Sequence, residues 1–125
     1  MTAEPAILYV EDEIIIALDT AQTLEEMGFS NVVVAHTLDK ARRLAAEQTF
    51  QIALLDINLG GGEISLDFGI ELRERGTNVI FASGYNSDEM RLENPGCEFI
   101  EKPLTRKTIR DAVVRAESSP PVASA

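Results

Sequence analysis

Five short apolar runs recur along the chain, and their spacing constrains the fold more than any other feature. The runs begin at Ala6, Val32, Ile52, Val79 and Glu98, so consecutive starts lie 26, 20, 27 and 19 residues apart. Each run is almost entirely apolar and does not alternate with polar residues, which is typical of parallel strands covered on both faces. Each interval has room for one strand and one helix, which indicates a repeated strand–helix unit.

Helical patterns fill the intervals between these runs. Apolar residues recur at helical spacing over 13–27, 38–48, 64–75 and 104–116, with Thr37 as an expected N-cap and Gly28 as an expected stop. The first of these stripes consists of Ile14, Ile15, Leu18, Leu24 and Met27. The segment 86–93 is short and polar and is followed by Pro95-Gly96. We therefore expect a marginal or mobile helix there.

Five strand–helix units with short connections predict an α/β fold. The expected architecture is a doubly wound, flavodoxin-like (βα)5 domain with a five-stranded parallel sheet of order 2-1-3-4-5. We expect this domain to span residues 1–117. The remaining segment, 118–125, is rich in serine, proline and alanine, and we expect it to be a disordered tail.

Charge and composition exclude several classes of function. The chain has 11 Lys+Arg against 21 Asp+Glu, a net charge of -10, which disfavours binding to nucleic acid or to an anionic membrane surface. A single cysteine, Cys97, rules out an internal disulfide and a multi-cysteine metal site. The N-terminal segment resembles neither a signal peptide nor a membrane span, so we expect a cytoplasmic protein.

Polar residues follow four of the five predicted strands. Glu11 and Asp12 follow the first strand, Asp56 the third, Ser83 closes the fourth, and Lys102 follows the fifth. In the predicted order the carboxyl ends of the parallel strands share one edge of the sheet, so these side chains should converge. Each has an ordinary structural explanation, such as an N-cap, a turn or a solvated lysine. Three carboxylates beside one ammonium group, however, would repel each other unless a cation joins them.

Three carboxylates and one ammonium group leave two negative charges unbalanced, and one divalent metal ion would neutralise them. The candidate ligands are oxygens, which favours Mg²⁺, or Mn²⁺, over zinc. A hard cation, a lysine and a hydroxyl beside the glycines of 60–62 suit phosphoryl transfer. The chain has neither a G-x-x-x-x-G-K-[ST] loop nor a G-x-G-x-x-G fingerprint to bind a nucleotide. The sequence therefore predicts Asp56 as a carboxylate acceptor for a phosphoryl group supplied from elsewhere.

Four motifs in order resemble those of a known family. ILYVEDE at 7–13, LLDINLG at 54–60, FASGY at 81–85 and EKP at 101–103 resemble the receiver domain of bacterial two-component response regulators, in the CheY-like superfamily. The FASGY segment, together with NLGG at 58–61 where most receivers have a proline, looks like the single-domain "FAT GUY" receivers. Those receivers are associated with sensor histidine kinases of the HWE and related classes.

The resemblance implies a role for each residue of the phosphorylation site. Asp56 would be the phosphoacceptor and would contact the metal. Asp12 would bind Mg²⁺ directly, Glu11 would bind it through water, and Asn58 would offer its backbone carbonyl. Glu11 stands where aspartate is commoner, and its longer side chain suits a water-mediated contact.

The resemblance also implies a conformational switch. Lys102 would pair with a phosphoryl oxygen, Ser83 would hydrogen-bond another, and Phe99 would change rotamer with them. Asn58 and Tyr85 occupy two variable positions that tune autodephosphorylation in the family. His36, the only histidine, follows the second strand, and we expect it to lie away from the cleft and to have no functional role.

Three functions are consistent with these residues. The first is a stand-alone receiver that accepts a phosphoryl group from a sensor histidine kinase. It would signal to a protein partner through the surface of segment 86–93, the fifth strand and the last helix, relay or store the phosphoryl group, and dephosphorylate itself. Such a protein is a switch and not a turnover enzyme. The alternatives are a Mg²⁺-dependent phosphohydrolase with an aspartyl nucleophile, for which Asn58 replaces the expected second acid, and a phosphorylation-independent interaction module.

Overall fold

The five predicted strands form one parallel sheet. The computed structural model describes residues 6–60, 64–84, 89, 92–94 and 97–118. The strands are β1 (Ala6–Val10), β2 (Asn31–Ala35), β3 (Ile52–Asp56), β4 (Asn78–Ser83) and β5 (Glu98–Glu101). Their order is β2-β1-β3-β4-β5, and each neighbouring pair is parallel. The predicted doubly wound, flavodoxin-like fold is confirmed.

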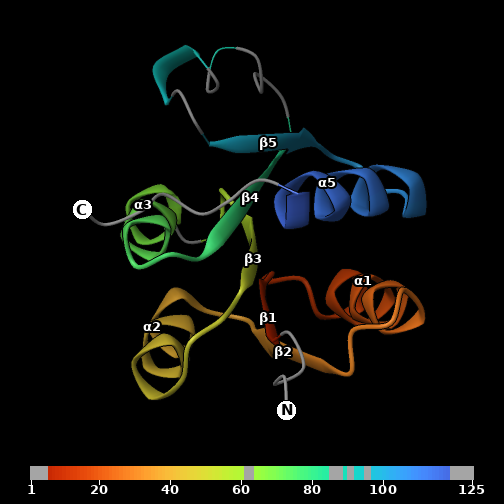
Figure 1. Ribbon diagram of the computed structural model, residues 1–125, viewed down its shortest axis with the longest axis horizontal. Helices are drawn as coiled ribbons and strands as arrows, with labels where there is room; N and C mark the ends of the chain where they lie inside the picture. The colour runs from red at the N-terminus through yellow and green to blue at the C-terminus, as the bar shows by residue number, and fades with distance from the viewer. Residues whose placement is uncertain (1–5, 61–63, 85–88, 90–91, 95–96, 119–125) are drawn as a thin grey trace.

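Helices from the described part of the chain pack on both faces of the sheet. They are α1 (Ile14–Glu26), α2 (Leu38–Glu47), α3 (Leu66–Glu74) and α5 (Arg106–Ser118). Figure 1 shows α1 and α5 on one face and α2 and α3 on the other. The Thr37 hydroxyl accepts a hydrogen bond from the Lys40 backbone N–H at 3.1 Å, which confirms the predicted N-cap. Most of the predicted helix over 86–93 and residues 119–125 of the predicted tail lie outside the described residues.

Alternate residues of each strand face opposite layers, which explains why the strands are apolar throughout. On the side of α2 and α3, Leu8, Leu55 and Phe81 pack with Phe68. On the side of α1 and α5, other strand residues pack with helix residues, among them Ile7, Leu54, Ile80, Leu24 and Val113. The sheet is therefore a rigid platform whose strand ends have defined positions. No helix within the described part of the chain is both long and apolar enough to span a membrane.

Helix α1 buries only the C-terminal part of the stripe that its sequence predicted. Ile14, Ile15 and Leu18 are exposed, with 83% of Ile15 accessible. Leu24 is buried together with Ala17, Thr20 and Thr23, and Met27 packs against the same core. Successive helical residues are rotated by about 100°, so a run of four apolar residues surrounds the helix and cannot all face the sheet. The isoleucines that remain outside form an exposed apolar surface on α1.

Candidate functional site

Three carboxylates meet at the carboxyl edge of the sheet. Val10 of β1 is in register with Leu55 of β3, so the residues that follow, Glu11 and Asp56, are neighbours. One ligand oxygen from each of Glu11, Asp12 and Asp56 lies within 4.8 Å of the others. Glu11 and Asp56 are buried, whereas Asp12 is more accessible. The predicted convergence of these acids is therefore present.

Lys102 extends from the end of β5 into this cluster. Its Nζ donates to Asp56 Oδ2 at 2.8 Å and to Glu11 Oε1 at 3.4 Å. The Lys102 backbone N–H donates to the Ser83 carbonyl at 2.7 Å, which ties the end of β5 to the end of β4. The Lys102–Pro103 peptide bond is cis. One ammonium group thus bridges two buried carboxylates that come from β1 and β3.

The cluster holds more negative charge than the lysine balances. Burial, and then the charge of Asp56, raises the pKa of the Glu11 carboxyl to about 7. Burial by itself would lower the pKa of the Lys102 ammonium, but its hydrogen bond to Asp56 and the charges of Asp56 and Glu11 outweigh this effect and leave that pKa raised. A proton on Glu11 and a cation beside it are alternative ways to relieve the repulsion.

Backbone contacts hold the end of β1 in place. The Glu11 N–H donates to the Ala35 carbonyl at 3.0 Å, and the His36 Nδ1 lies 3.0 Å from the Glu11 carbonyl oxygen, to which it donates as Nδ1–H. The parallel pairing of β1 with β2 thus brings His36 beside the Glu11 backbone. Asp12 is also not an N-cap. Glu13 occupies that position in α1 and makes no side-chain cap bond.

Ser65 anchors the segment that follows Asp56, a role that sequence reasoning missed. Its Oγ donates to the Asp56 carbonyl at 2.7 Å, and its N–H donates to the Ile57 carbonyl at 3.0 Å. The Ile57 N–H in turn donates to the Ala82 carbonyl at 3.0 Å. A serine directly before a helix normally indicates an N-cap, but Ser65 makes no cap bond. Only the fold reveals that its hydroxyl bonds to the backbone of the predicted phosphoacceptor.

The remaining predicted residues lie on β4 and β5 or directly after β3, apart from Tyr85, which is outside the described residues. Ser83 is buried at the carboxyl end of β4. Phe99 is fully buried and stacks on Phe81, with ring centroids 5.2 Å apart and an interplanar angle of 23°. Asn58 follows β3 with an exposed side chain and pairs with Ile64 in an isolated bridge.

The donor set fits a hard divalent cation. Its ligands are carboxylate oxygens, close enough for one ion to contact all three, and such ligands suit Mg²⁺ or Mn²⁺. The buried Glu11 with its raised pKa shows that this position favours a neutralised carboxylate. Glu11, Asp12 and Asp56 could therefore hold the ion beside Lys102.

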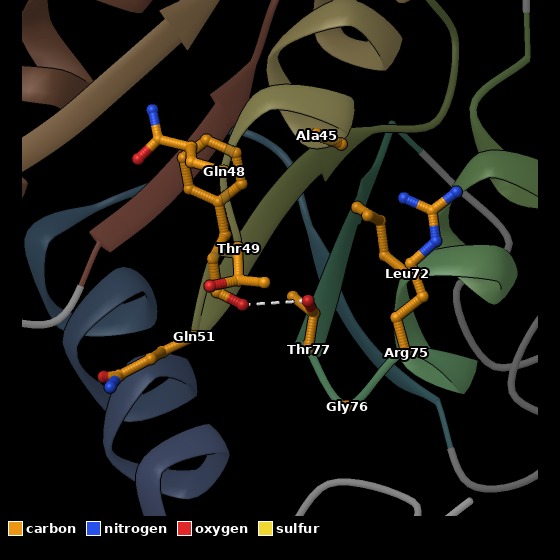
Figure 2. Close-up of a pocket in the computed structure, with 9 residues that line it drawn as sticks. Ala45, Gln48, Thr49, Gln51, Leu72, Arg75, Gly76 and Thr77 are labelled. Atoms are coloured by element: carbon orange, nitrogen blue, oxygen red, sulfur yellow. Dashed lines mark hydrogen bonds between the residues drawn. The ribbon is translucent and has the colours of Figure 1, made fainter.

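A hollow lies at the amino ends of β3 and β4, at the edge of the sheet opposite the acidic cluster, and its lining residues differ from those of the cluster. Its volume is about 230 Å³, and it lies among residues that precede β3 and β4, including Gln51 and Arg75. Figure 2 shows the Thr77 hydroxyl bonded to a backbone oxygen at this hollow; the acceptor is the Phe50 carbonyl, at 2.8 Å. None of its lining residues is a carboxylate, so it shares no feature with the acidic cluster.

Comparison with known proteins agrees with this arrangement. The sequence profile of the response regulator receiver domain matches residues 7–114. The chain belongs to this family. Receiver domains accept a phosphoryl group from histidine kinases and signal to protein partners. A search of curated proteins finds no match to this receiver domain.

Solved structures share the fold of this receiver domain. SdrG from Sphingomonas melonis Fr1, at 29% identity, superimposes with a TM-score of 0.76 over 94% of this chain and 99% of that one. The PhyR receiver domain of Erythrobacter litoralis, at 22% identity, gives 0.83 over 98% and 97%. A receiver protein from Sinorhizobium medicae WSM419, at 24% identity, gives 0.80 over 92% and 95%. The latter two are similar in fold alone.

Proposed function

We propose that this receiver domain accepts a phosphoryl group on Asp56 in a Mg²⁺-dependent reaction and later hydrolyses the acyl phosphate. The observation that carries the proposal is the contact of Lys102 Nζ with Asp56 Oδ2 at 2.8 Å, with the Glu11 and Asp12 carboxylates in the same cluster. Asp56 is buried at a strand end and aimed at this group of charges. That combination suits a nucleophile whose product carries additional negative charge.

The chain's own residues account for each step. A carboxylate oxygen of Asp56 attacks phosphorus, and the bond from phosphorus to the donor atom breaks, with its electron pair leaving on the donor. Lys102 offsets the charge of the phosphoryl oxygens. Bound Mg²⁺, or Mn²⁺, held by Glu11, Asp12, Asp56 and the Asn58 carbonyl, would neutralise further phosphoryl charge. Attack of water on phosphorus then releases inorganic phosphate and restores Asp56, at a rate tuned by Asn58 and Tyr85.

Phosphorylation would change the side of the sheet formed by β4 and β5. Ser83 closes β4 beside the cluster, and its hydroxyl would bond a phosphoryl oxygen. Phe99 on β5 would follow by changing its packing against Phe81, which it now stacks upon. The surface of segment 86–93, β5 and α5 would thereby signal to a protein partner. In this scheme the protein is a switch that modifies itself and not a turnover enzyme.

The exposed surface of α1 supports a protein as the phosphoryl donor. Ile15 and Ile16 line a hollow of about 370 Å³ that also includes Lys102 and Pro103. Ile15 and Leu18 are largely exposed beside it. Contiguous exposed apolar side chains mark protein interaction sites, and this surface adjoins the lysine that contacts Asp56. We propose a sensor histidine kinase of the HWE or a related class as the donor, and a downstream signalling or phosphotransfer protein as the recipient.

The experiment is phosphorylation of the full chain with acetyl phosphate and Mg²⁺. Intact-mass analysis should show a gain of one phosphoryl group that hydroxylamine removes, as expected for an acyl phosphate. The adduct should be absent in Asp56→Asn and present in Asp67→Asn, a matched control at an exposed aspartate of α3. Retention of the adduct in Asp56→Asn would contradict the assignment.

The same experiment distinguishes the two alternatives. Steady release of phosphate from a small phosphoester, with no stable adduct, would indicate a phosphohydrolase. Asn58, two residues after Asp56, lacks the carboxyl expected of a general acid in such an enzyme. No adduct together with unchanged partner binding in Asp56→Asn would indicate an interaction module.

A further inference from the structure

The loop after β3 makes an unusually close approach to one of the acidic side chains. Gly60 has a φ of 65°, and a Cβ atom placed on it would lie 2.8 Å from Asp12 Oδ2 and 3.8 Å from Asp12 Cγ. Real Cβ atoms essentially never approach another heavy atom within 3.0 Å. The Asp12 carboxylate therefore occupies space that any side chain at position 60 would need.

We propose that Gly60 is a positioning residue for Asp12, and that the missing side chain lets the loop close against this carboxylate and hold it in the cation cluster. Asp12 has a short side chain, so an added Cβ would force its carboxylate to rotate. That rotation would move a ligand oxygen that now lies within 4.8 Å of those of Glu11 and Asp56. The inference rests on the proposed metal dependence and deepens it.

Two other glycines allow the effect of the Asp12 contact to be distinguished from the effect of a positive φ. Gly28 and Gly76 also have positive φ values, of 106° and 99°, but a Cβ on either would meet nothing within 4 Å. Left-handed backbone alone accounts for glycine at those helix ends. At Gly60 the conformation and the contact with Asp12 act together. Alanine at all three positions therefore shares the backbone strain, and only Gly60→Ala also crowds a predicted ligand.

The test is calorimetric titration of the folded, full-length chain with MgCl2, repeated with MnCl2. Gly60→Ala should weaken binding about tenfold or more, the size of effect that supporting residues have on metal affinity. Gly28→Ala and Gly76→Ala should remain within about twofold of the wild type, since neither touches a ligand. Equal loss in all three variants, or no loss in Gly60→Ala, would overturn the inference.

A double-mutant cycle tests whether Gly60→Ala weakens metal binding through the Asp12 carboxylate. In an Asp12→Ala background, Gly60→Ala should cost no further affinity, because the crowded carboxylate is already gone. Equal losses with and without Asp12 would overturn the inference and assign the effect to the loop alone. If Gly60→Ala does not fold, Gly60→Asn keeps the Cβ while tolerating positive φ. The same weakening is expected of it.

Failure of the proposed function has a separate signature. A folded wild-type chain that binds neither Mg²⁺ nor Mn²⁺ would overturn the metal dependence and this inference with it. A wild-type chain that binds the ion, with Gly60→Ala equal to it, would overturn only the role of Gly60.

Discussion

Lys102 and Asp56, 46 residues apart in the chain, form the shorter of the two lysine–carboxylate contacts of the acidic cluster, at 2.8 Å from Nζ to Oδ2 against 3.4 Å to Glu11 Oε1. The contact joins the end of β5 to the end of β3, two strands that are separated by β4 in the sheet. Only 24% of the Lys102 side chain is exposed, so solvent screens this pair less than a surface ion pair. Lys102 is thus the internal counter-ion of the site in the absence of metal.

Replacing Lys102 with methionine should destabilise the metal-free protein. Loss of the ammonium group leaves Asp56 and Glu11 without their shared partner, and we expect a loss of about 1–3 kcal/mol in the free energy of unfolding at pH 8. Chemical denaturation in EDTA measures it. Lys107→Met is the control, because Lys107 pairs with Asp111 on the exposed surface of α5, where solvent screens the ion pair and its loss should have little effect. Equal effects of the two substitutions would contradict a special role for Lys102.

The pKa of Glu11 predicts how stability depends on pH. A carboxyl whose pKa is raised on folding, here to about 7, holds its proton more tightly in the folded state. It therefore stabilises the fold fully below its unfolded pKa and loses this contribution as the pH rises through about 7. In EDTA, wild-type stability should fall between pH 4.5 and 8 relative to Glu11→Gln, by up to about 3 kcal/mol. Parallel pH profiles for the two proteins would contradict the shift.

Magnesium should reverse part of this dependence. The ion binds the ionised carboxylates, so its affinity should rise with pH as Glu11 loses its proton. Denaturation with and without MgCl2 at pH 6 and pH 8 measures the difference. Stabilisation by Mg²⁺ should be larger at pH 8, and an equal gain at both values would show that Glu11 does not take part.

The exposed apolar surface of α1 should matter to a protein donor and not to a small one. Ile15→Glu places a charge in the hollow beside Lys102, so phosphotransfer from a phosphorylated kinase that labels the wild type should slow about tenfold. Labelling by acetyl phosphate should be unchanged, and stability should change by about 0.5 kcal/mol or less. Val114→Glu, at an exposed position of α5, is the control. Equal slowing with both donors would show that Ile15→Glu impairs the phosphorylation of Asp56 itself and not the binding of a protein donor.

Gly69 should be essential to the packing that holds Phe99. A Cβ at this helical position would lie 2.3 Å from Phe81 Cζ, and Phe81 in turn stacks on Phe99. Gly69→Ala should therefore destabilise the protein by about 1–3 kcal/mol through overpacking, although alanine favours a helix by about 1 kcal/mol. Thermal denaturation measures it. Phe81→Leu in the same chain should recover part of the loss. A stabilised Gly69→Ala would show that the aromatic pair moves freely.

The sequence was sufficient for the strands, their order and the edge at which the acids gather. A parallel strand covered on both faces is apolar along most of its length, so its extent follows the apolar run closely, as in β3, where Ile52 to Leu55 precede Asp56. Once the order was inferred, residues that follow neighbouring strands had to meet at one edge. The predictions for Glu11, Asp12 and Asp56 as a cluster needed no further information, because they depend on periodicity and topology.

Contacts between distant segments were decided only by the tertiary structure. Four apolar residues in succession at the start of α1 could not reveal which of them would face the sheet, and Ile14 and Ile15 remained largely exposed. Ser65 is the N-cap residue of α3, yet its hydroxyl bonds the Asp56 carbonyl and not a helix N–H. The close approach of Gly60 to Asp12 likewise had no signal in the sequence, because it depends on the backbone conformation of the loop, with a φ of 65° at Gly60. Local residues determine the propensity for a helix or strand and the pattern of apolar positions. The contacts of residues such as Ser65 and Gly60 depend on which distant segments the folded backbone brings together.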